Sequence, residues 1–314
     1  MRMTRREALG AGAVLLVSPA LAQEKKEPPM IPGPDPNVKT PAFKAPAGAV
    51  DTHCHIFGPQ AKYPFVPTRP YTPPEAPLEA FRALHEKIGV ERAVIVNATT
   101  HGSDHRVVAD AIAASGGKYR GVVNLADTTT DAEISALEAA GIRACRFVFL
   151  ARLGGKPDFS RVRRMAERVK AVGWHVDLYF EPALLEALTP EMESLPTPYV
   201  IDHMGGIKAA EGLDQPAFNA LLALFKRDEK CWLKISGPER MSAKGAPFTD
   251  AVPFARKIIE TAPDRVIWGS DWPHPNVPVM PNDGDLVDLI PQYAPDATLQ
   301  RKLLVDNPAR LFRF

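Results

Sequence analysis

The sequence predicts an α/β fold, a single-domain (β/α)8 barrel in which parallel strands alternate with covering helices. Short apolar runs, of the kind expected for buried parallel strands, recur along residues 49–314. Segments with apolar residues at helical spacing separate these runs. Because the alternation covers the whole region, it requires a parallel sheet covered by helices, and eight units that close on themselves are the simplest architecture.

Eight apolar runs are the strand candidates of this barrel. They cover residues 49–50, 93–96, 121–123, 144–150, 175–180, 199–201, 231–235 and 266–268. The alternative is a doubly wound open sheet. It is disfavoured because no glycine-rich phosphate-binding motif follows the first run.

The segments between the early runs have the period of amphipathic helices. Thr130 and Glu133 have the spacing of a capping box, which marks the start of a helix. Gly89, Gly141 and Gly173 stand where helices are expected to end. The apolar positions of these segments are Leu78, Phe81, Leu84 and Ile88; Val107, Val108, Ala111 and Ile112; Ile134 and Leu137; and Val162, Met165 and Val169.

The first 22 residues have the pattern of a bacterial export signal. Arg5 and Arg6 precede an apolar stretch at residues 8–17, and the triplet at residues 20–22 fits cleavage after Ala22. The paired arginines fit the twin-arginine type, and the apolar stretch is shorter than the ~20 residues that span a bilayer. We therefore expect a periplasmic protein with no membrane contact after signal removal. An uncleaved membrane anchor is the alternative.

Residues 23–48 form a Pro-rich segment without apolar periodicity. Such a segment cannot bury enough apolar surface to offset its loss of conformational entropy. It is predicted to be an N-terminal linker, or a tail that lies on the surface of the domain formed by residues 49–314.

Charge and cysteine content exclude several classes of protein. The chain has 38 basic and 37 acidic residues, and this balance offers no electrostatic surface for nucleic acid or an anionic membrane. Cys54, Cys145 and Cys231 are odd in number and lie in or beside apolar runs. We expect buried packing residues rather than a disulfide framework.

Three strings of sequence place polar side chains at the end of an apolar run. They are VDTHCHIFGP at residues 50–59, VIDHMGG at 200–206 and VIWGSDWPHP at 266–275. Residues at the carboxyl ends of barrel strands point into the catalytic mouth. His53, His55, His203 and Asp271 are therefore predicted to meet in one active site, with His53 and His55 facing one side of their strand and Cys54 packed behind them.

Other reactive residues near these strings are weaker candidates. Ser236 and Ser270 suggest a nucleophile, but no G-x-S-x-G elbow is present. Lys234 on the seventh run could form a Schiff base, although a structural or anion-pairing lysine is favoured. His274 either lines the mouth of the barrel or fixes its loop, and His101 is expected as a solvent-exposed group or a helix cap.

The strings VDTHCHIFGP, VIDHMGG and DRVIWGSDWPHPN resemble the amidohydrolase superfamily, in particular its branch of 2-pyrone-4,6-dicarboxylate lactonases. The similarity covers nearly all of residues 46–314 and includes VIVNATTHGSD, RACRFVFLARL, GWHVDLYFE and GPERM. It implies a (β/α)8 barrel in which Asp271 is the general base that activates water. It also implies that His53, His55 and His203 polarise the lactone carbonyl.

Arginines are the expected carboxylate-binding groups, because a guanidinium offers paired donors that match a carboxylate. Arg146 lies in an apolar strand, where an unpaired charge is costly, and should meet an anion. By resemblance, Arg152 and Arg240 bind substrate carboxylates, while Tyr71, Thr99 and Tyr179 donate neutral hydrogen bonds. Thr99 departs from the serine of related lactonases, which leaves the size of the substrate open.

The metal content is predicted from the same strands. Related metal sites add a carboxylated lysine on the fourth strand or a histidine on the fifth, where this chain has Arg146 and Tyr179. We expect metal-free hydrolysis with no cofactor required. A single zinc or manganese on His53, His55 and Asp271 is the alternative, because three protein ligands suffice for a catalytic site.

The function predicted by these residues is hydrolysis of a small carboxylated lactone by Asp-activated water, with no nucleic-acid partner. A sugar-acid lactonase and a metal-dependent decarboxylase on the same barrel are the alternatives among enzymes. A periplasmic binding protein for aromatic carboxylates is the alternative from another class. It is disfavoured because a carboxylate such as Asp271 is unwelcome beside an anionic ligand unless it takes part in chemistry.

Overall fold

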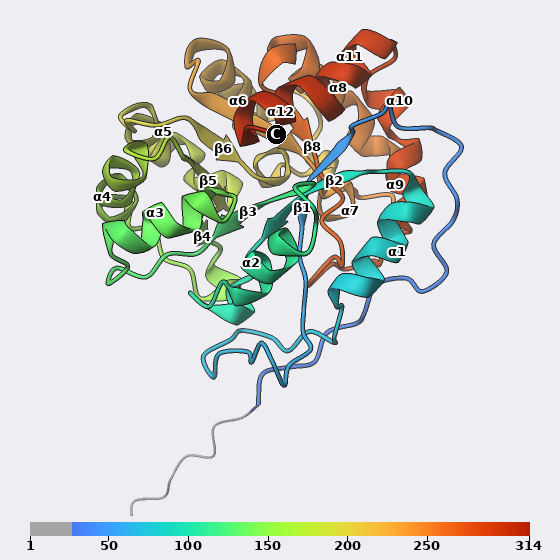
Figure 1. Cartoon of the computed structure of the whole chain (residues 1–314). Helices are drawn as coiled ribbons and strands as arrows, with labels where there is room; N and C mark the ends of the chain where they lie inside the picture. Colours follow the sequence, from blue (N-terminus) through green and yellow to red (C-terminus); the bar gives the residue numbers. More distant parts are fainter. Residues whose placement is uncertain (1–26) are drawn as a thin grey trace, which may run out of the picture.

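The computed structural model describes residues 27–314, which form a (β/α)8 barrel (Figure 1). Eight parallel strands follow one another around the sheet in the order of the chain, so the predicted fold is confirmed and the open-sheet alternative is excluded. The strands are β1 (Val50–Cys54), β2 (Arg92–Val96), β3 (Tyr119–Val123), β4 (Ile142–Phe149), β5 (His175–Phe180), β6 (Tyr199–Ile201), β7 (Cys231–Ile235) and β8 (Val266–Trp268).

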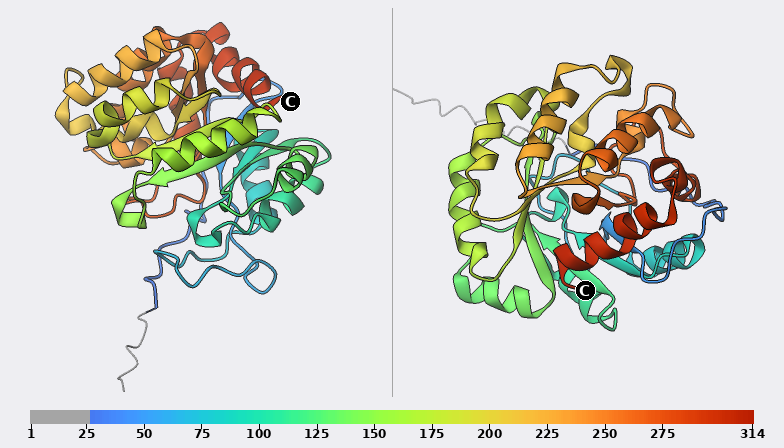
Figure 2. Two further views of the ribbon diagram at one scale, coloured as in Figure 1. Left: turned by 90° about the vertical axis from the view of Figure 1, so that its left-hand side faces the viewer. Right: turned by 90° about the horizontal axis from the view of Figure 1, so that it is seen from above.

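The helices lie around the outside of the strands (Figure 2). Those predicted from apolar spacing begin and end close to the expected residues, and Thr130 and Glu133 form the predicted capping box. The helices are α1 (Leu78–Ile88), α2 (Arg106–Ala113), α3 (Asp131–Ala139), α4 (Phe159–Lys170), α5 (Leu185–Glu193), α6 (Pro216–Arg227), α7 (Pro238–Met241), α8 (Val252–Thr261), α9 (Asp283–Asp288), α10 (Ile290–Tyr293), α11 (Ala297–Arg301) and α12 (Asn307–Phe312).

Strand β1 is longer than predicted. The prediction relied on apolar runs, and most residues of this strand are polar. Asp51, Thr52 and His53 are all fully buried. The Thr52 hydroxyl donates to the Trp268 carbonyl at 2.7 Å, and Asp51 accepts the backbone N–H of Ser270 at 2.9 Å. These polar groups therefore replace apolar packing with hydrogen bonds that tie β1 to the end of β8.

The barrel closes where the chain after β8 runs beside β1. The backbone N–H of Asp271 donates to the His53 carbonyl at 2.7 Å, and that of His55 donates to the Trp272 carbonyl at 2.7 Å. Gly269 permits this approach, because a Cβ at its position would lie 2.6 Å from the Cβ of His53. The same backbone contacts fix Asp271 next to His53 and His55.

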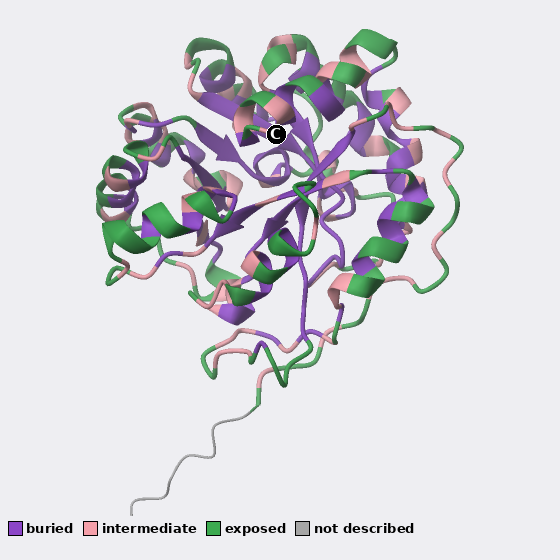
Figure 3. Ribbon diagram, viewed as in Figure 1, coloured by how far each residue is buried: buried purple, intermediate pink, exposed green. Residues whose placement is uncertain are grey.

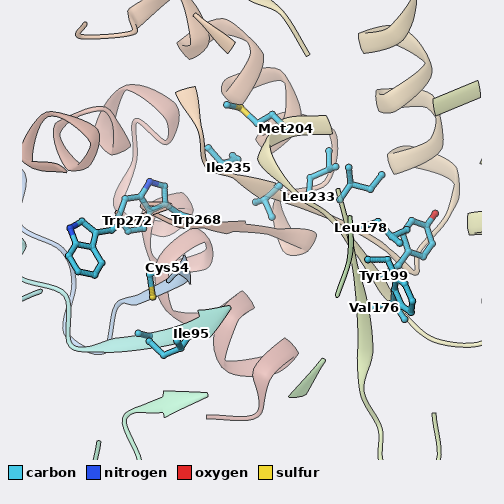
Figure 4. Packing of buried hydrophobic residues seen from close by; sticks show 14 of the residues in the cluster. Cys54, Ile95, Val176, Leu178, Tyr199, Met204, Leu233, Ile235, Trp268 and Trp272 are labelled. Atoms are coloured by element: carbon cyan, nitrogen blue, oxygen red, sulfur yellow. The ribbon is translucent and has the colours of Figure 1, made fainter. Parts of the chain in front are cut away.

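Two apolar layers hold the fold together. The larger lies between the strands and the helices, and Figure 3 shows buried residues on the inward faces of the helices. Figure 4 shows Cys54 and Ile95 in this layer, together with Trp268 and Trp272. Cys54 thus packs behind the histidines, as predicted. A smaller group inside the barrel comprises Val50, Val94, Val96, Val122, Ala144, Val200, Trp232, Ile267 and Phe312.

The three cysteines lie within the described residues, where they are buried and free, as predicted. Burial raises the pKa of Cys145 and of Cys231 to about 12. A protonated thiol is a poor nucleophile and metal ligand. The cysteines therefore serve as packing residues.

The described part of the Pro-rich segment lies against the barrel. Lys39 pairs with Asp285 and Asp288 of α9, and its backbone N–H donates to Asn282 at 2.9 Å. The proposed export signal at residues 1–22 lies outside the described residues. Among residues 27–314, no helix has the length and apolar character that a membrane crossing requires.

Candidate active site

The carboxyl ends of the strands surround a small cavity. This is the position at which (β/α)8 barrels hold their active sites. Of the ten residues predicted for catalysis and substrate binding, His53 alone is absent from its lining and lies buried beside it. The nine that line the cavity are His55, Tyr71, Thr99, Arg146, Arg152, Tyr179, His203, Arg240 and Asp271.

Asp271 faces the three predicted histidines. Its Oδ1 lies 3.6 Å from Nε2 of His53, 3.4 Å from Nε2 of His55 and 4.0 Å from Nε2 of His203. Both Asp271 and His203 have a left-handed backbone, with φ of 68° and 50°. Such conformations are uncommon for residues other than glycine and cluster at functional sites. The chain thus turns sharply after β8 and β6 to place these side chains.

Arg240 holds the other oxygen of Asp271. Its Nε and Nη2 donate to Oδ2 at 2.8 and 2.6 Å, and Nη2 also donates to the carbonyl of Pro275 at 2.8 Å. Burial alone would raise the pKa of Asp271, but the charge of the Arg240 guanidinium outweighs it and holds this pKa well below its usual range. The carboxylate is therefore ionised at neutral pH.

The imidazoles are held by different partners. Nδ1 of His55 lies 2.8 Å from the Val96 carbonyl, and Nδ1 of His203 lies 2.8 Å from the Ser236 hydroxyl. The ring centroids of His53 and His55 are 5.1 Å apart, so both face one side of β1, as predicted. Burial lowers the pKa of His53 to about 4 and that of His203 well below its usual value. Both rings are therefore neutral at pH 7.

The three arginines have different surroundings. Arg146 meets the anion predicted for it, but that anion belongs to the protein: its Nε donates to Asp202 Oδ2 at 2.9 Å. Arg152 is exposed and forms no ion pair within residues 27–314. Arg240 is engaged by Asp271, so a substrate carboxylate must share or displace this contact.

The three neutral residues all line the cavity. Burial raises the pKa of Tyr71 to about 12, so its hydroxyl remains a donor. The ring of Tyr179 lies 4.6 Å from that of His203, and the guanidinium carbon of Arg146 lies 5.6 Å from the centre of the same tyrosine ring. Thr99 follows β2 and lines the cavity with Tyr71.

A buried ionic network lies next to the cavity. Lys234 Nζ donates to Asp177 Oδ2 and to Asp202 Oδ1, each at 2.8 Å, and Asp202 also accepts from Arg146. Burial opposes the charge of Lys234, but the two carboxylates outweigh it and raise its pKa. The same ammonium lies 3.2 Å from Nδ1 of His53. This pairing agrees with the anion-pairing interpretation of Lys234 rather than with a free amine.

Sequence reasoning missed Asp202, Asp177 and Lys208 as parts of this region. The sequence did hold a signal for this network. Side chains two residues apart on a strand face the same side, and an inward-facing residue precedes Arg146, Asp177 and Lys234 by two positions in each strand. These three side chains therefore face the barrel interior as well. Lys208 lines a hollow that shares Arg152, Tyr179 and Arg240 with the first cavity. No strand motif pointed to it.

Among the weaker candidates, Ser236 and Lys234 contact His203 and His53, whereas the remaining three lie away from the cavity. The Ser270 hydroxyl donates to Asp51, which ties it to strand closure. His274 is fully buried, and its Nε2 lies 3.1 Å from Asp283 Oδ1 of α9, so it fixes its loop rather than lining the cavity. The expectation of a solvent-exposed or capping His101 is wrong, because its ring is buried against Phe57 and Phe65.

In the part of the chain that the structure describes, two groups of side chains could hold a metal ion: His53 with His55 and Asp271, and His53 with Asp202 and His203. In the second group both Asp202 oxygens already accept hydrogen bonds from cations. In the first group Asp271 Oδ1 accepts no hydrogen bond from Arg240, which binds Oδ2 instead. The fit of this group therefore depends on whether His53 offers a lone pair at Nε2.

The fold and the cavity define a class of protein: a (β/α)8 barrel with a buried carboxylate and three imidazoles at the carboxyl ends of its strands. Titratable groups gathered in a cavity of this kind are typical of an enzyme active site. A family model described as Amidohydrolase matches residues 50–314, and the chain belongs to this family.

Comparisons with individual proteins agree with the family. The chain is 46% identical over 285 residues to a 2-pyrone-4,6-dicarboxylate hydrolase of Comamonas testosteroni, covering 88% of this chain and 93% of that protein. It is 42% identical over 275 residues to a 4-sulfomuconolactone hydrolase of Rhizobium radiobacter, covering 86% and 92%. An Agrobacterium tumefaciens crystal structure superposes with a TM-score of 0.77 at 32% identity, covering 87% of this chain and 98% of that one. The predicted family and hydrolase class are confirmed.

Proposed function

We propose that this protein hydrolyses the ring ester of a small lactone bearing carboxylates, 2-pyrone-4,6-dicarboxylate or a close relative of it. The observation that carries the proposal is the position of Asp271 Oδ1, 3.4–4.0 Å from three imidazole nitrogens within an arginine-lined cavity. The names of the two relatives support the proposal. One is a hydrolase of 2-pyrone-4,6-dicarboxylate, and the other is a hydrolase of 4-sulfomuconolactone.

The carboxylates of the substrate orient the ring. The cavity wall carries Arg146, Arg152 and Arg240, and guanidinium groups bind carboxylates through paired donors. Arg146 uses Nε for Asp202, which leaves its terminal nitrogens for the ligand. Tyr71 and Thr99 also line the cavity and supply neutral hydroxyl groups. Holding both reactants in one cavity lowers the entropic part of the barrier.

Asp271 is the proposed general base. Its Oδ1 takes a proton from water as the water oxygen attacks the lactone carbonyl carbon. The imidazoles around Oδ1 hold the water and stabilise the negative charge that develops on the carbonyl oxygen. The bond from the carbonyl carbon to the ring oxygen then breaks, the ring oxygen receives the proton from Asp271, and an acyclic acid leaves.

We propose that this reaction needs no metal. The cation at this site is a guanidinium, because Arg240 neutralises Asp271 directly. Chelator-treated protein should keep its activity, with no bound metal in proportion to protein by elemental analysis. Parallel loss of metal and activity, with recovery on adding zinc or manganese, would overturn this part of the proposal.

The ultraviolet absorbance of 2-pyrone-4,6-dicarboxylate tests the function directly. Purified protein should remove this absorbance and release one proton per ester bond at fixed pH. A panel of uncharged and sugar-acid lactones should react more slowly, because they lack the paired carboxylates. Tight binding of the pyrone without turnover would favour the binding-protein alternative instead.

We also propose that the protein is exported through a twin-arginine signal at residues 1–22. The paired Arg5 and Arg6 and the short apolar stretch support this location. A fluorescent fusion to the first residues of the chain should reach the periplasm, and substitution of both arginines by lysine should retain it in the cytosol. Export that is indifferent to both arginines would contradict the proposal.

A further inference from the structure

His53 and His55, two residues apart on β1, are held by partners of opposite hydrogen-bonding character. Nδ1 of His55 lies 2.8 Å from the Val96 carbonyl, which can only accept. Nδ1 of His53 lies 3.2 Å from the Lys234 ammonium, which can only donate. The other nitrogen, Nε2, faces Asp271 in both rings.

We infer that Lys234 fixes the tautomer of His53, so that Nε2 of His53, buried beside the cavity and facing Asp271, carries the hydrogen and acts as a hydrogen-bond donor rather than as a metal ligand. In the neutral ring, acceptance at Nδ1 requires the hydrogen to be on Nε2. His55 has the opposite tautomer and presents a lone pair at Nε2. Lys234 is a positioning residue in this arrangement, because it acts on the site through His53.

The hydrogen-bond inventory of Lys234 supports this tautomer. The ammonium has three hydrogens and three acceptors within reach: Asp177 Oδ2 and Asp202 Oδ1 at 2.8 Å, and Nδ1 of His53 at 3.2 Å. Lys234 is fully buried, so water cannot satisfy a hydrogen left without an acceptor. The reverse tautomer would turn a second donor towards the ammonium.

The competing acceptor for an Nδ1 hydrogen is Asp202 Oδ1, at the longer distance of 3.4 Å from Nδ1. That oxygen already accepts from Lys234, and the other oxygen of Asp202 accepts from Arg146. The shorter contact and the satisfied carboxylate both favour donation by Lys234 to His53.

The surroundings of His53 Nε2 also support a hydrogen on this atom. It is buried, and within residues 27–314 it has no hydrogen-bond partner. Its distance of 3.6 Å from Asp271 Oδ1 is too long for a hydrogen bond. A buried N–H without a partner is a donor preorganised for an oxygen that arrives with the ligand.

This assignment divides the work of the two histidines. His53 donates to the developing oxyanion, while the lone pairs of His55 Nε2 and Asp271 Oδ1, 3.4 Å apart, can accept the two hydrogens of one water. The role at the oxyanion depends on the proposed hydrolysis. The tautomers and the poor fit to a metal do not, because a metal would need the lone pair that the Nε2 hydrogen occupies.

Nitrogen NMR of wild-type protein labelled with ¹⁵N-histidine tests the tautomers without any substrate. His53→Gln and His55→Gln identify the signals among the eight histidines. We expect Nδ1 unprotonated and Nε2 protonated in His53, and the reverse in His55. A protonated Nδ1 in His53 would overturn the inference, whether or not the protein hydrolyses a lactone.

Zinc binding tests the consequence. Lys234→Met combined with Asp177→Asn removes one charge of each sign and leaves Asp202 paired with Arg146. His53 Nδ1 can then donate to Asp202, which frees Nε2. Hydrogen-bond partners that orient a metal-binding histidine change metal affinity by about 10–100-fold. We expect the double variant to bind zinc at least tenfold more tightly than wild type, and His53→Gln to abolish this gain.

Lys226→Met, which removes an exposed lysine on α6, is the control and should leave zinc affinity unchanged. Tight zinc binding by wild-type protein that requires His53 would overturn the inference, as would equal zinc affinity of wild type and double variant. If the double variant does not fold, the NMR measurement on wild type still decides the assignment.

Discussion

Arg240 binds Oδ2 of Asp271 with two hydrogen bonds of 2.6 and 2.8 Å and leaves Oδ1 turned towards the imidazoles. The two oxygens of this carboxylate therefore have different surroundings. The pairing of one with Arg240 keeps the group ionised, and the other, beside the histidines, is free to receive a proton. A base that is easily ionised is also a weak base, so the pair favours activity at low pH over maximum proton affinity.

Asp271→Asn should preserve the fold and lower kcat by about 10²–10⁴-fold, the usual contribution of a general base. The fold should survive because the asparagine oxygen can still accept from Arg240, and the backbone bond to His53 does not involve the side chain. Steady-state kinetics with the pyrone measures the loss, and circular dichroism verifies the fold. Near-complete retention of turnover would remove Asp271 from the role of base.

Arg240→Met should shift the acid limb of the kcat/KM profile to higher pH. Arg240 lowers the pKa of Asp271, and the ionised carboxylate is the active form, so removing the cation raises that pKa and the base protonates at a higher pH. The value of kcat/KM at its optimum should also fall about 10–100-fold, because charge-assisted hydrogen bonds to the substrate are lost.

Arg152→Met is the matched control for the effect on pH. It removes a cavity arginine that has no ion pair among the described residues, so the acid limb should stay in place while KM rises. An equal shift in both variants would assign the effect to the general field of the cavity rather than to the pair of Arg240 with Asp271.

Arg146→Met should weaken both substrate binding and the fold. The sequence alone predicts mainly a loss of carboxylate binding. The structure adds a second effect, because Arg146 pairs with the fully buried Asp202. Asp202 keeps Lys234 as a partner, so the loss should be smaller than the value of about 3–5 kcal/mol that follows when a buried charge is left unpaired. Urea denaturation should show this loss, whereas Arg152→Met should stay within about 0.5 kcal/mol of wild type.

The barrel is predictable from the sequence because buried parallel strands consist of consecutive apolar residues. The runs at 175–180, 199–201, 231–235 and 266–268 coincide with β5 to β8. Strand β1 is largely missed because Asp51, Thr52 and His53 are polar residues whose partners lie on the chain after β8. Hydrogen bonds across such a sequence separation leave no local pattern.

The members of the site are predictable in the same way, but their pairing is not. His203 and Asp271 follow apolar runs, so their position at strand ends can be derived. Whether Arg146 faces a ligand or Asp202, and which atom Lys234 contacts, depends on distances between strands far apart in the chain. Spacing within one strand carries no such information.

The pair of His274 with Asp283 should make stability fall as the pH rises above about 6.5. Burial opposes protonation of His274, but Asp283 outweighs it and raises the pKa above the ordinary value of 6.5. The imidazolium is therefore favoured in the folded state. Its contribution is fully present below pH 6.5 and is lost as the pH rises through the folded-state pKa.

Asp283→Asn should lower the free energy of unfolding at pH 6 and flatten its decline above about pH 6.5, since one proton changes stability by up to about 1.4 kcal/mol per pH unit. Asp285→Asn on the same helix is the control, because its partner Lys39 lies at the surface and titrates outside this range. Urea denaturation followed by tryptophan fluorescence gives both curves. His53 and His203 have lowered pKa values and act only below pH 6.5, so a decline that persists in Asp283→Asn would assign the effect to another group.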